Sequence, residues 1–273
     1  MVRGVPLVLA GRPTVDITDL PSLSTVFAAH RPALVINAAA YTAVDKAETD
    51  VDAARAANQE GPARLAVLCQ TTGAALVHLS TDYVFDGRKP SPYREDDPVA
   101  PLNVYGLTKA AGEEAVRGSL SRHIILRTAW VYSPVGHNFM TTMLRLGQER
   151  DVVRVVADQI GSPTSADDLA AAILDIAPRL AAEPDGSRLW GTYHLTGAGE
   201  TSWHGFAAEI FKLAQSAGRK VPRLEAITTQ EYPAPAVRPL HCILDTSKFR
   251  QTFGLTLPAW QDSVPACFKR LAY

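Results

Sequence analysis

Short apolar runs alternate with longer amphipathic stretches through the first two-thirds of the chain. The runs predict buried strands, and the stretches between them predict helices that cover a sheet. The expected strands are 7–10, 34–37, 75–79, 124–127, 152–156 and 192–195. The expected helices are 19–30, 51–71, 105–117, 138–148, 166–176 and 203–217, with a break or restart at Gly61-Pro62. This order predicts an α/β protein with a doubly wound parallel sheet.

The pattern loosens after about residue 180. The stretch 229–240 contains three prolines and little periodicity, which is typical of irregular structure. We therefore expect a larger domain over 1–134, with contributions from about 151–197, and a smaller lobe mainly over 135–273.

Composition excludes several classes of protein. The 273 residues carry 27 Lys and Arg against 28 Asp and Glu, a net charge of −1, which predicts no nucleic-acid partner and no anionic membrane surface. The three cysteines, Cys69, Cys242 and Cys267, are far apart and form no metal-binding motif, so no metal site is expected. No secretory signal and no apolar run of about 18 residues is visible, which predicts a cytoplasmic protein.

Tyr105 and Lys109 are four residues apart on a predicted helix and therefore share one face. A neighbouring ammonium group favours the phenolate and lowers the pKa of tyrosine from about 10. Such a tyrosine can exchange a proton with a substrate oxygen while hydride moves at carbon. Taken alone, the same spacing more often marks a solvated helix face.

Two predicted strands end in residues suited to a site. The run 76–82 is apolar and ends in Ser80, Thr81 and Asp82, and the strand at 34–37 is followed by three alanines, 38–40. The carboxyl ends of parallel strands line the ligand crevice of a doubly wound sheet. Each feature alone could be a turn, a cap or a helix start, but together and in this order they predict a ligand site.

Longer strings extend this pattern over nearly the whole chain. They lie at 15–19, 37–48, 80–87, 101–109, 127–132 and 158–164, with Arg238-Pro239 and Leu244-Asp245 near the C-terminus. On these strings the sequence resembles the extended short-chain dehydrogenase/reductase family, and within it the dTDP-4-dehydrorhamnose reductases. The resemblance implies a Rossmann-like cofactor-binding domain and a smaller substrate-binding lobe. It implies NADPH-dependent reduction of the 4-keto group of dTDP-4-dehydro-L-rhamnose, with NADH as an alternative cofactor, and it alone suggests Mg²⁺ and a homodimer.

The resemblance also assigns roles to residues. Thr81, Tyr105 and Lys109 match the catalytic triad, in which Tyr105 gives a proton to the keto oxygen. Asp82 and Trp130 match positions that contact substrate, together with Thr81 and Tyr105. The cofactor positions are Arg12, Asp16, Ile17, Ala38, Ala39, Ala40, Tyr41, Thr42, Tyr105 and Lys109. Arg12 could meet a 2′-phosphate or could be a solvated loop arginine, and Trp130 could instead be a core aromatic residue.

Some positions depart from the family. The opening strand and GxxGxxG turn of the family are absent, so the first strand of the sheet is expected to be missing and 7–10 to be the second strand. We therefore expect Met1 to be an internal or misassigned start, or the chain to be an inactive remnant. Gly197-Ala-Gly199 resembles a phosphate-binding turn but is interpreted as a loop before the helix at Trp203. His241-Cys242 replaces the family's Asn-Ser.

Two other functions remain open. The regulatory beta subunit of methionine adenosyltransferase shares many of these strings but serves as a binding partner rather than a reductase. Dehydratases and epimerases of the same superfamily need an added acid or base near the active-site threonine, and Asp82 is the one candidate here.

Overall fold

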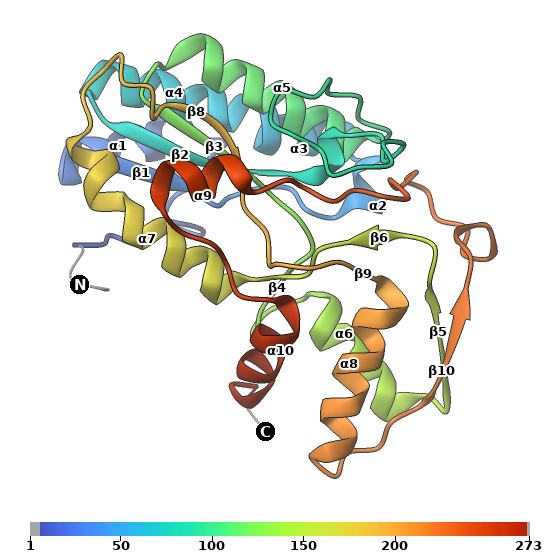
Figure 1. Cartoon of the computed structure of the whole chain (residues 1–273). Coiled ribbons are helices and arrows are strands. Elements are labelled where there is room, and N and C mark those ends of the chain that lie inside the picture. The colour runs from blue at the N-terminus through green and yellow to red at the C-terminus, as the bar shows by residue number, and fades with distance from the viewer. Residues whose placement is uncertain (1–5, 272–273) are drawn as a thin grey trace.

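A four-stranded parallel sheet forms the centre of the computed structural model, which describes residues 6–271 (Figure 1). Its strands are β1 (Leu34–Asn37), β2 (Ala75–Thr81), β3 (His123–Thr128) and β8 (Gly191–His194), in the order β1-β2-β3-β8. In this register Asn37 lies opposite His78, and Thr81 lies opposite Thr128. The ends of β1, β2 and β3 therefore lie at one edge of the sheet.

Helices cover both faces of the sheet. One face packs against α4 (Gly61–Thr72) and α5 (Val104–Ser119), with α1 (Leu20–His30) beside α4. The other face packs against α7 (Ala166–Ala182) and α9 (Ser247–Phe253). Leu76 points to the first face and Val77 to the second, as expected from the alternation of side chains along a strand. This arrangement confirms the predicted doubly wound, Rossmann-like fold.

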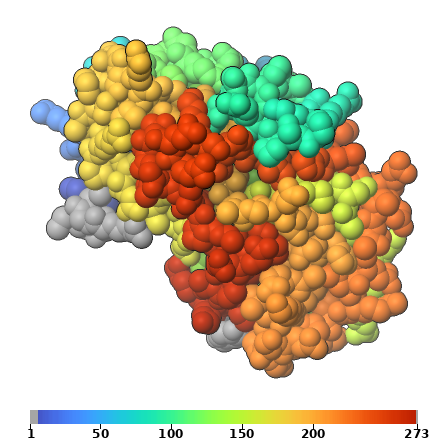
Figure 2. All heavy atoms as spheres, viewed as in Figure 1, coloured from blue at the N-terminus to red at the C-terminus, as the bar shows by residue number. Residues whose placement is uncertain are grey.

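A second lobe surrounds its own apolar core (Figure 1). It contains α6 (Phe139–Glu149), β5 (Val152–Val156), α8 (Trp203–Ser216), β10 (Arg223–Ile227) and α10 (Trp260–Lys269). β5 pairs with β10 and lies outside the four-stranded sheet. The segment from α9 to α10 runs over the surface from the sheet to this lobe (Figure 2).

Two pairs of short strands lie where the chain passes between the sheet and the second lobe. β4 (Val131–Tyr132) pairs with β7 (Thr164–Ser165), and β6 (Ile160–Gly161) pairs with β9 (Thr201–Ser202). The remaining elements are α2 (Val44–Ala47), α3 (Val51–Arg55), the π-helix η1 (Ala56–Glu60), and the 3-10 turns η2 (Asp82–Val84) and η3 (Thr229–Glu231).

The strand predicted at 7–10 is not formed. Leu7, Val8 and Leu9 lie exposed without a strand partner, and Leu9 is 88% exposed. A strand is stable only beside another strand, and within residues 6–271 none pairs with the outer edge of β1. That prediction was wrong because an apolar run does not show whether a neighbouring strand is present.

The other predicted elements are present with small changes at their ends. Asp19 caps α1 by accepting a hydrogen bond from the Ser22 amide. The predicted interruption near Gly61-Pro62 takes the form of the π-helix η1, which ends at Glu60, and Pro62 lies in the first turn of α4. No helix within the described part of the chain is long and apolar enough to span a membrane.

Candidate active site

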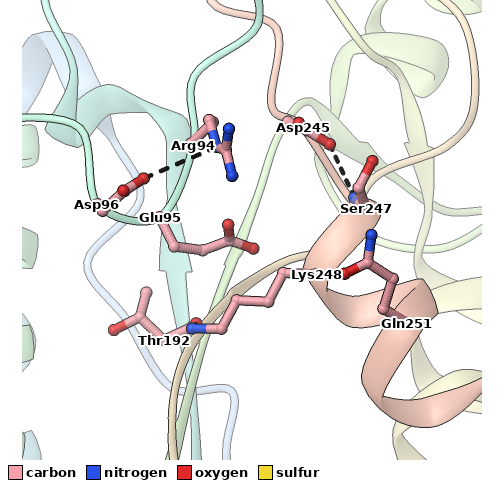
Figure 3. Close-up of a pocket in the computed structure, with 8 residues that line it drawn as sticks. All are labelled: Arg94, Glu95, Asp96, Thr192, Asp245, Ser247, Lys248 and Gln251. Atoms are coloured by element: carbon pink, nitrogen blue, oxygen red, sulfur yellow. Dashed lines mark hydrogen bonds and ion pairs between the residues drawn. The ribbon is translucent and has the colours of Figure 1, made fainter.

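A pocket of about 470 Å³ opens beside β8 and α9 (Figure 3). Its walls are Arg94, Glu95, Asp96, Thr192, Asp245, Ser247, Lys248 and Gln251. Lys248 already donates to the Thr192 carbonyl oxygen (2.8 Å), and Asp245 accepts from the Ser247 amide (2.8 Å). None of these residues was predicted for the site, so the pocket is distinct from the predicted chemistry.

The predicted catalytic residues gather instead at the end of β2. Asn103 caps α5 by accepting from the Gly106 amide (2.8 Å). A Cβ at Gly106 would lie 2.2 Å from the Tyr83 carbonyl oxygen, so only glycine lets the helix approach η2 this closely. The close approach brings Tyr105, in the first turn of α5, to the last residue of β2.

The Thr81 hydroxyl lies beside the phenol of Tyr105 and lowers its pKa. The Thr81 hydroxyl donates its proton to Asp82 Oδ1 at 3.0 Å, so three of the predicted residues lie in a row. Burial raises the pKa of Tyr105 to about 12, while the neighbouring Thr81 hydroxyl opposes this shift. Tyr105 is therefore a protonated phenol at neutral pH.

Lys109 lies one turn beyond Tyr105 on the same face of α5 and is 2% exposed. Its ammonium group donates to the Leu79 carbonyl oxygen at 2.6 Å. Burial lowers the pKa of Lys109 to about 8, and the charge of Glu113 opposes that shift. The lysine therefore lies against the backbone of β2, two residues before Thr81.

Asp82 is a buried carboxyl group at the site and is 2% exposed. Burial raises its pKa to about 7, because a charged carboxylate is poorly solvated there. The thiol of Cys242 donates to the Asp82 carbonyl oxygen (3.2 Å). Cys242, one of the positions that depart from the family, is therefore part of the packing under the site.

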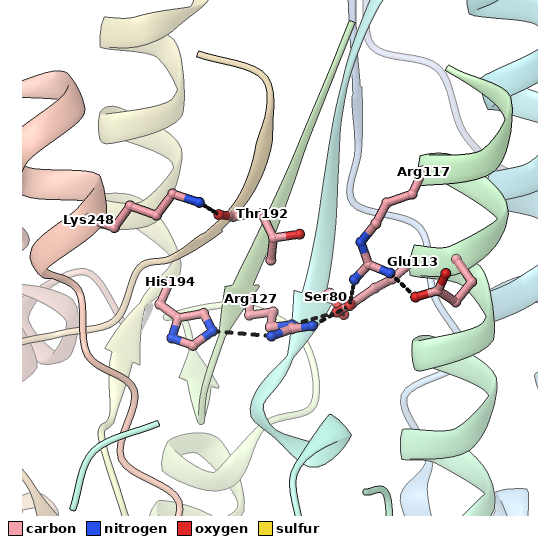
Figure 4. A network of polar contacts seen from close by, with 8 residues as sticks. Ser80, Glu113, Arg117, Arg127, Thr192, His194 and Lys248 are labelled. Carbon is pink, nitrogen blue, oxygen red and sulfur yellow. Dashed lines mark hydrogen bonds and ion pairs between the residues drawn. The ribbon is translucent and has the colours of Figure 1, made fainter. Parts of the chain in front are cut away.

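A buried network behind these residues was not predicted (Figure 4). Glu113 on α5 accepts from Arg127 Nε (2.9 Å) and Nη2 (2.7 Å) on β3, and from the Ser80 hydroxyl (2.6 Å). Arg127 also contacts His194 on β8, with 3.4 Å between Nη1 and Nε2. The i, i+4 spacing of Lys109 and Glu113 was the sequence signal that could have revealed the carboxylate.

Trp130 follows β3 and has a left-handed backbone, with φ of 47°. Its ring stacks on Trp203 of α8, with centroids 3.5 Å apart and 7° between the planes. A Cβ at Gly161 would lie 2.3 Å from the same ring. Trp130 is partly exposed, so it is neither a solvated residue nor a fully buried core aromatic.

The three alanines after β1 form an open turn. Ala38 and Ala39 are exposed, and the Ala39 amide donates to Asn37 Oδ1 (3.1 Å). The side chain of Asn37 also contacts the buried His78, with 2.9 Å between Nδ2 and Nδ1. This turn presents backbone without side chains beyond Cβ to its surroundings.

Asn58, in the π-helix, holds the end of that turn and was also not predicted. Its Oδ1 accepts from the Tyr41 amide (2.8 Å), and its Nδ2 donates to the Tyr41 carbonyl oxygen (3.1 Å) and to the Thr108 hydroxyl (3.2 Å). One amide group thus ties the predicted cofactor segment to α5. Thr42, next in the chain, is exposed.

The three predicted residues near the start of the chain lie away from this catalytic group. Arg12 is exposed and its Nε donates to Asp16 Oδ2 (2.7 Å). The amide and hydroxyl of Thr18, together with Arg12, lower the pKa of Asp16 to about 2. Ile17 packs against Gly61, where a Cβ would lie 2.7 Å from Ile17 Cγ1.

Near the C-terminus, Arg238 forms a two-point ion pair with Asp45. Its Nη1 and Nη2 lie 2.9 and 2.8 Å from the two carboxylate oxygens. His241 is partly exposed. Within residues 6–271, no group of three or more His, Cys, Asp or Glu side chains is arranged to hold a metal ion.

Comparison with known proteins identifies the family of this chain. The family model of the RmlD substrate binding domain matches residues 2–273. A dTDP-4-dehydrorhamnose reductase of Sinorhizobium fredii is 42% identical over 259 residues, which cover 95% of this chain and 87% of the relative. The chain belongs to the dTDP-4-dehydrorhamnose reductase family. The Escherichia coli (strain K12) member of the family is 41% identical over 94% of this chain and 85% of its own length.

Solved structures of the family agree. The dTDP-4-dehydrorhamnose reductase of Bacillus anthracis, crystallised in complex with NADP, has a TM-score of 0.86 at 39% identity and covers 94% of this chain and 87% of that chain. A dTDP-glucose 4,6-dehydratase of Streptomyces venezuelae has a TM-score of 0.74 at 19% identity, over 93% of this chain and 77% of its own, and shows the shared fold alone. The predicted family and fold are both confirmed.

Proposed function

We propose that this chain reduces the 4-keto group of dTDP-4-dehydro-L-rhamnose to give dTDP-L-rhamnose, with NADPH as the reductant. The observation that carries the proposal is the close approach of the Thr81 hydroxyl to the phenol of Tyr105, with Lys109 one turn further along the same helix face. Relatives 41–42% identical over most of the chain are reductases of this name.

The proton for the keto oxygen comes from Tyr105. Because burial raises its pKa to about 12, the phenol carries its proton at neutral pH and can donate it. Thr81 is the second hydroxyl at the same point and hydrogen-bonds the substrate oxygen in this proposal. The buried ammonium group of Lys109 stabilises the phenolate that forms when Tyr105 gives up its proton.

The donors and surfaces present fit the nicotinamide end of a dinucleotide. The exposed turn of Ala38 and Ala39 lets a flat ring or ribose approach the backbone, and Lys109 can hold a ribose hydroxyl. When bound, the nicotinamide supplies the hydride. We propose that the cofactor extends along the other predicted positions, Ala40, Tyr41, Thr42, Asp16 and Ile17. NADPH is favoured because a relative of 39% identity was solved with NADP.

We further propose that the sheet-bearing part of the chain holds the cofactor and that the second lobe holds the sugar nucleotide. Trp130 lies where these parts meet, since its ring packs on Trp203 of α8. With Asp82 it is the proposed contact to the sugar. Recognition of a 2′-phosphate by Arg12, a homodimer and Mg²⁺ stay predictions that rest on family resemblance.

The experiment is an NADPH-oxidation assay with enzymatically prepared dTDP-4-dehydro-L-rhamnose, with product identified by mass and NMR. Tyr105→Phe is expected to lower kcat by about 10²–10⁴-fold, the usual contribution of a general acid. Tyr193→Phe is the matched control, because its hydroxyl is buried on β8 and donates to the Leu189 carbonyl oxygen (2.9 Å). A wild-type chain that binds the sugar nucleotide without turnover would instead support the regulatory class of protein.

A further inference from the structure

Lys109 and Glu113 fasten two successive turns of α5 to neighbouring residues of β2. The Lys109 ammonium group donates to the Leu79 carbonyl oxygen, and the Ser80 hydroxyl donates to Glu113 Oε1, both at 2.6 Å. Residues four apart share a helix face, so the ammonium and the carboxylate lie on the same side of α5. Thr81, the next residue of β2, belongs to the proposed catalytic group.

The Glu113 carboxylate is the hub of the buried network (Figure 4). Arg127 donates to both of its oxygens, Ser80 to one, and Arg117 Nη2 to the other at 2.6 Å. The side chains of Glu113 and Arg127 are each 1% exposed. Burial raises the pKa of Glu113, but the bonds and charge of Arg127, with help from Ser80 and Arg117, lower it below its usual value. The carboxylate is therefore ionised.

Lys109 sits among groups of several charges. It interacts with Glu113 on its own helix and with His78 on β2. Through these two it is linked to Arg117 on α5, to His123 and Arg127 on β3, and to His194 on β8. Burial lowers the pKa values of His78, His123 and His194, so these rings are neutral. Glu113 is the carboxylate whose charge raises the pKa of Lys109 against the effect of burial. The arginines of the network act through Glu113, which they hold in place.

We propose that Glu113 is a positioning residue for Lys109: held by Ser80, Arg117 and Arg127, it supplies the buried negative charge that keeps the lysine amine protonated. This inference rests on the proposed function, because it concerns the lysine of the same site. A protonated amine can donate to a ribose hydroxyl and stabilise a tyrosine phenolate, whereas a neutral amine does neither well.

The test is the titration of Lys109 in the free protein, followed by NMR of ¹³C-labelled lysine side chains and assigned with Lys109→Met. Glu113→Gln keeps the size of the side chain and removes its charge. The Lys109 pKa is expected to fall by about one pH unit or more, as for loss of an opposite charge at close range. The sign is informative, because mere loosening of the site would move the pKa upward, toward about 10.4 for a solvated lysine.

Two further variants complete the design. Glu114→Gln removes the neighbouring carboxylate on α5, whose side chain is 77% exposed, and is expected to leave the Lys109 titration unchanged. If the single variant does not fold, Glu113→Gln is combined with Arg127→Gln, which also removes the buried arginine that Glu113 pairs and leaves Lys109 as the group to be titrated. The Lys109 pKa of this double variant is also expected to fall.

An unchanged or raised Lys109 pKa in folded Glu113→Gln, or in the folded double variant, overturns the inference. The outcome does not depend on turnover, since the titration needs neither cofactor nor substrate. A wild-type chain without reductase activity would therefore count against the proposed function while the lysine titration still decides the role of Glu113.

Discussion

The indole rings of Trp130 and Trp203 lie almost parallel with their centroids 3.5 Å apart, although the two residues are 73 positions apart in the sequence. Trp130 leaves the sheet on a left-handed residue, and Trp203 begins the main helix of the second lobe. A non-glycine residue with this backbone is strained and persists only where its surroundings fix it. Stacking on Trp203 therefore fixes the orientation of Trp130 at the junction of the sheet and the second lobe.

Replacing Trp203 is expected to weaken substrate binding through Trp130. Trp203→Leu removes an aromatic pair worth about 0.5–1.5 kcal/mol, so the KM for the sugar nucleotide should rise roughly two- to tenfold while the KM for NADPH stays constant. Steady-state kinetics with each substrate varied in turn measures both. Trp190→Phe is the control, because Trp190 takes no part in the stack and its Nε1 donates to the Pro184 carbonyl oxygen. Equal changes in both KM values would contradict the prediction.

Gly161 is expected to tolerate no side chain. In Gly161→Ala the new Cβ would lie 2.3 Å from the ring of Trp130, which cannot retreat because Trp203 stacks on it. Overpacking of this kind costs about 1–3 kcal/mol of unfolding free energy, measured by urea denaturation. Gly118→Ala is the matched control: nothing lies within 4 Å of its new Cβ, and alanine should stabilise α5 by up to about 1 kcal/mol. If both variants behave alike, the ring is free to move.

Asp82 gives a pH dependence of stability with a defined sign. In the folded chain its carboxyl keeps a proton up to about pH 7, whereas an unfolded aspartate loses it near pH 4. The stability that this difference provides is complete below about pH 4 and is lost as the pH rises toward 7. Asp82→Asn does not ionise, so its unfolding free energy relative to wild type should increase across that interval.

Thermal or urea unfolding at a series of pH values measures the effect. Asp96→Asn, at a carboxylate whose side chain is 86% exposed, is the comparison and should run parallel to wild type. A difference between Asp82→Asn and wild type that stays constant from pH 4 to 7 would show that Asp82 is ionised in the folded chain.

Asn58, whose side chain is fully buried, should contribute strongly to the free energy of unfolding. Asn58→Ala leaves the Tyr41 amide and carbonyl without their partners, which costs about 2–3 kcal/mol for buried polar groups. Gln59→Ala, at the adjacent and partly exposed amide, should change the unfolding free energy by about 0.5 kcal/mol or less. Denaturation curves of both variants decide the point, and similar losses would mean that the bridge to Tyr41 is dispensable.

Local patterns predicted most of the helices and strands because periodicity, caps and proline positions act over a few residues. The cap at Asp19 and the position of Pro62 in the first turn of α4 are examples. Such patterns could not predict which strands, far apart in the sequence, would pair with each other. The apolar run 7–10 has no strand partner, and β5 pairs with β10, which comes some 70 residues later.

The site shows the same division. The strand-end rule and the helix spacing together predicted a site at this point, where Thr81 lies beside Tyr105 and Lys109 bonds the backbone of the same strand. They did not reveal that Glu113 would be paired with Arg127, since nothing local marks which arginine folds against a given carboxylate. They also could not show that Arg12 would form an ion pair with Asp16, because that pair depends on the conformation of the loop between them.

The π-helical turn of residues 56–60 has a consequence for the history of the sequence. Such a turn holds one residue more than a regular turn, so α3, η1 and α4 together correspond to a single helix that has gained a residue. Losing that residue again would rotate one end of the helix against the other by about 100°. Asn58 would then turn away from Tyr41. Its carbonyl oxygen would also move away from Gly112; in the present structure a Cβ built on Gly112 would lie 2.0 Å from that oxygen. In an alignment, a one-residue gap here would mark lineages that secure the alanine turn by other means.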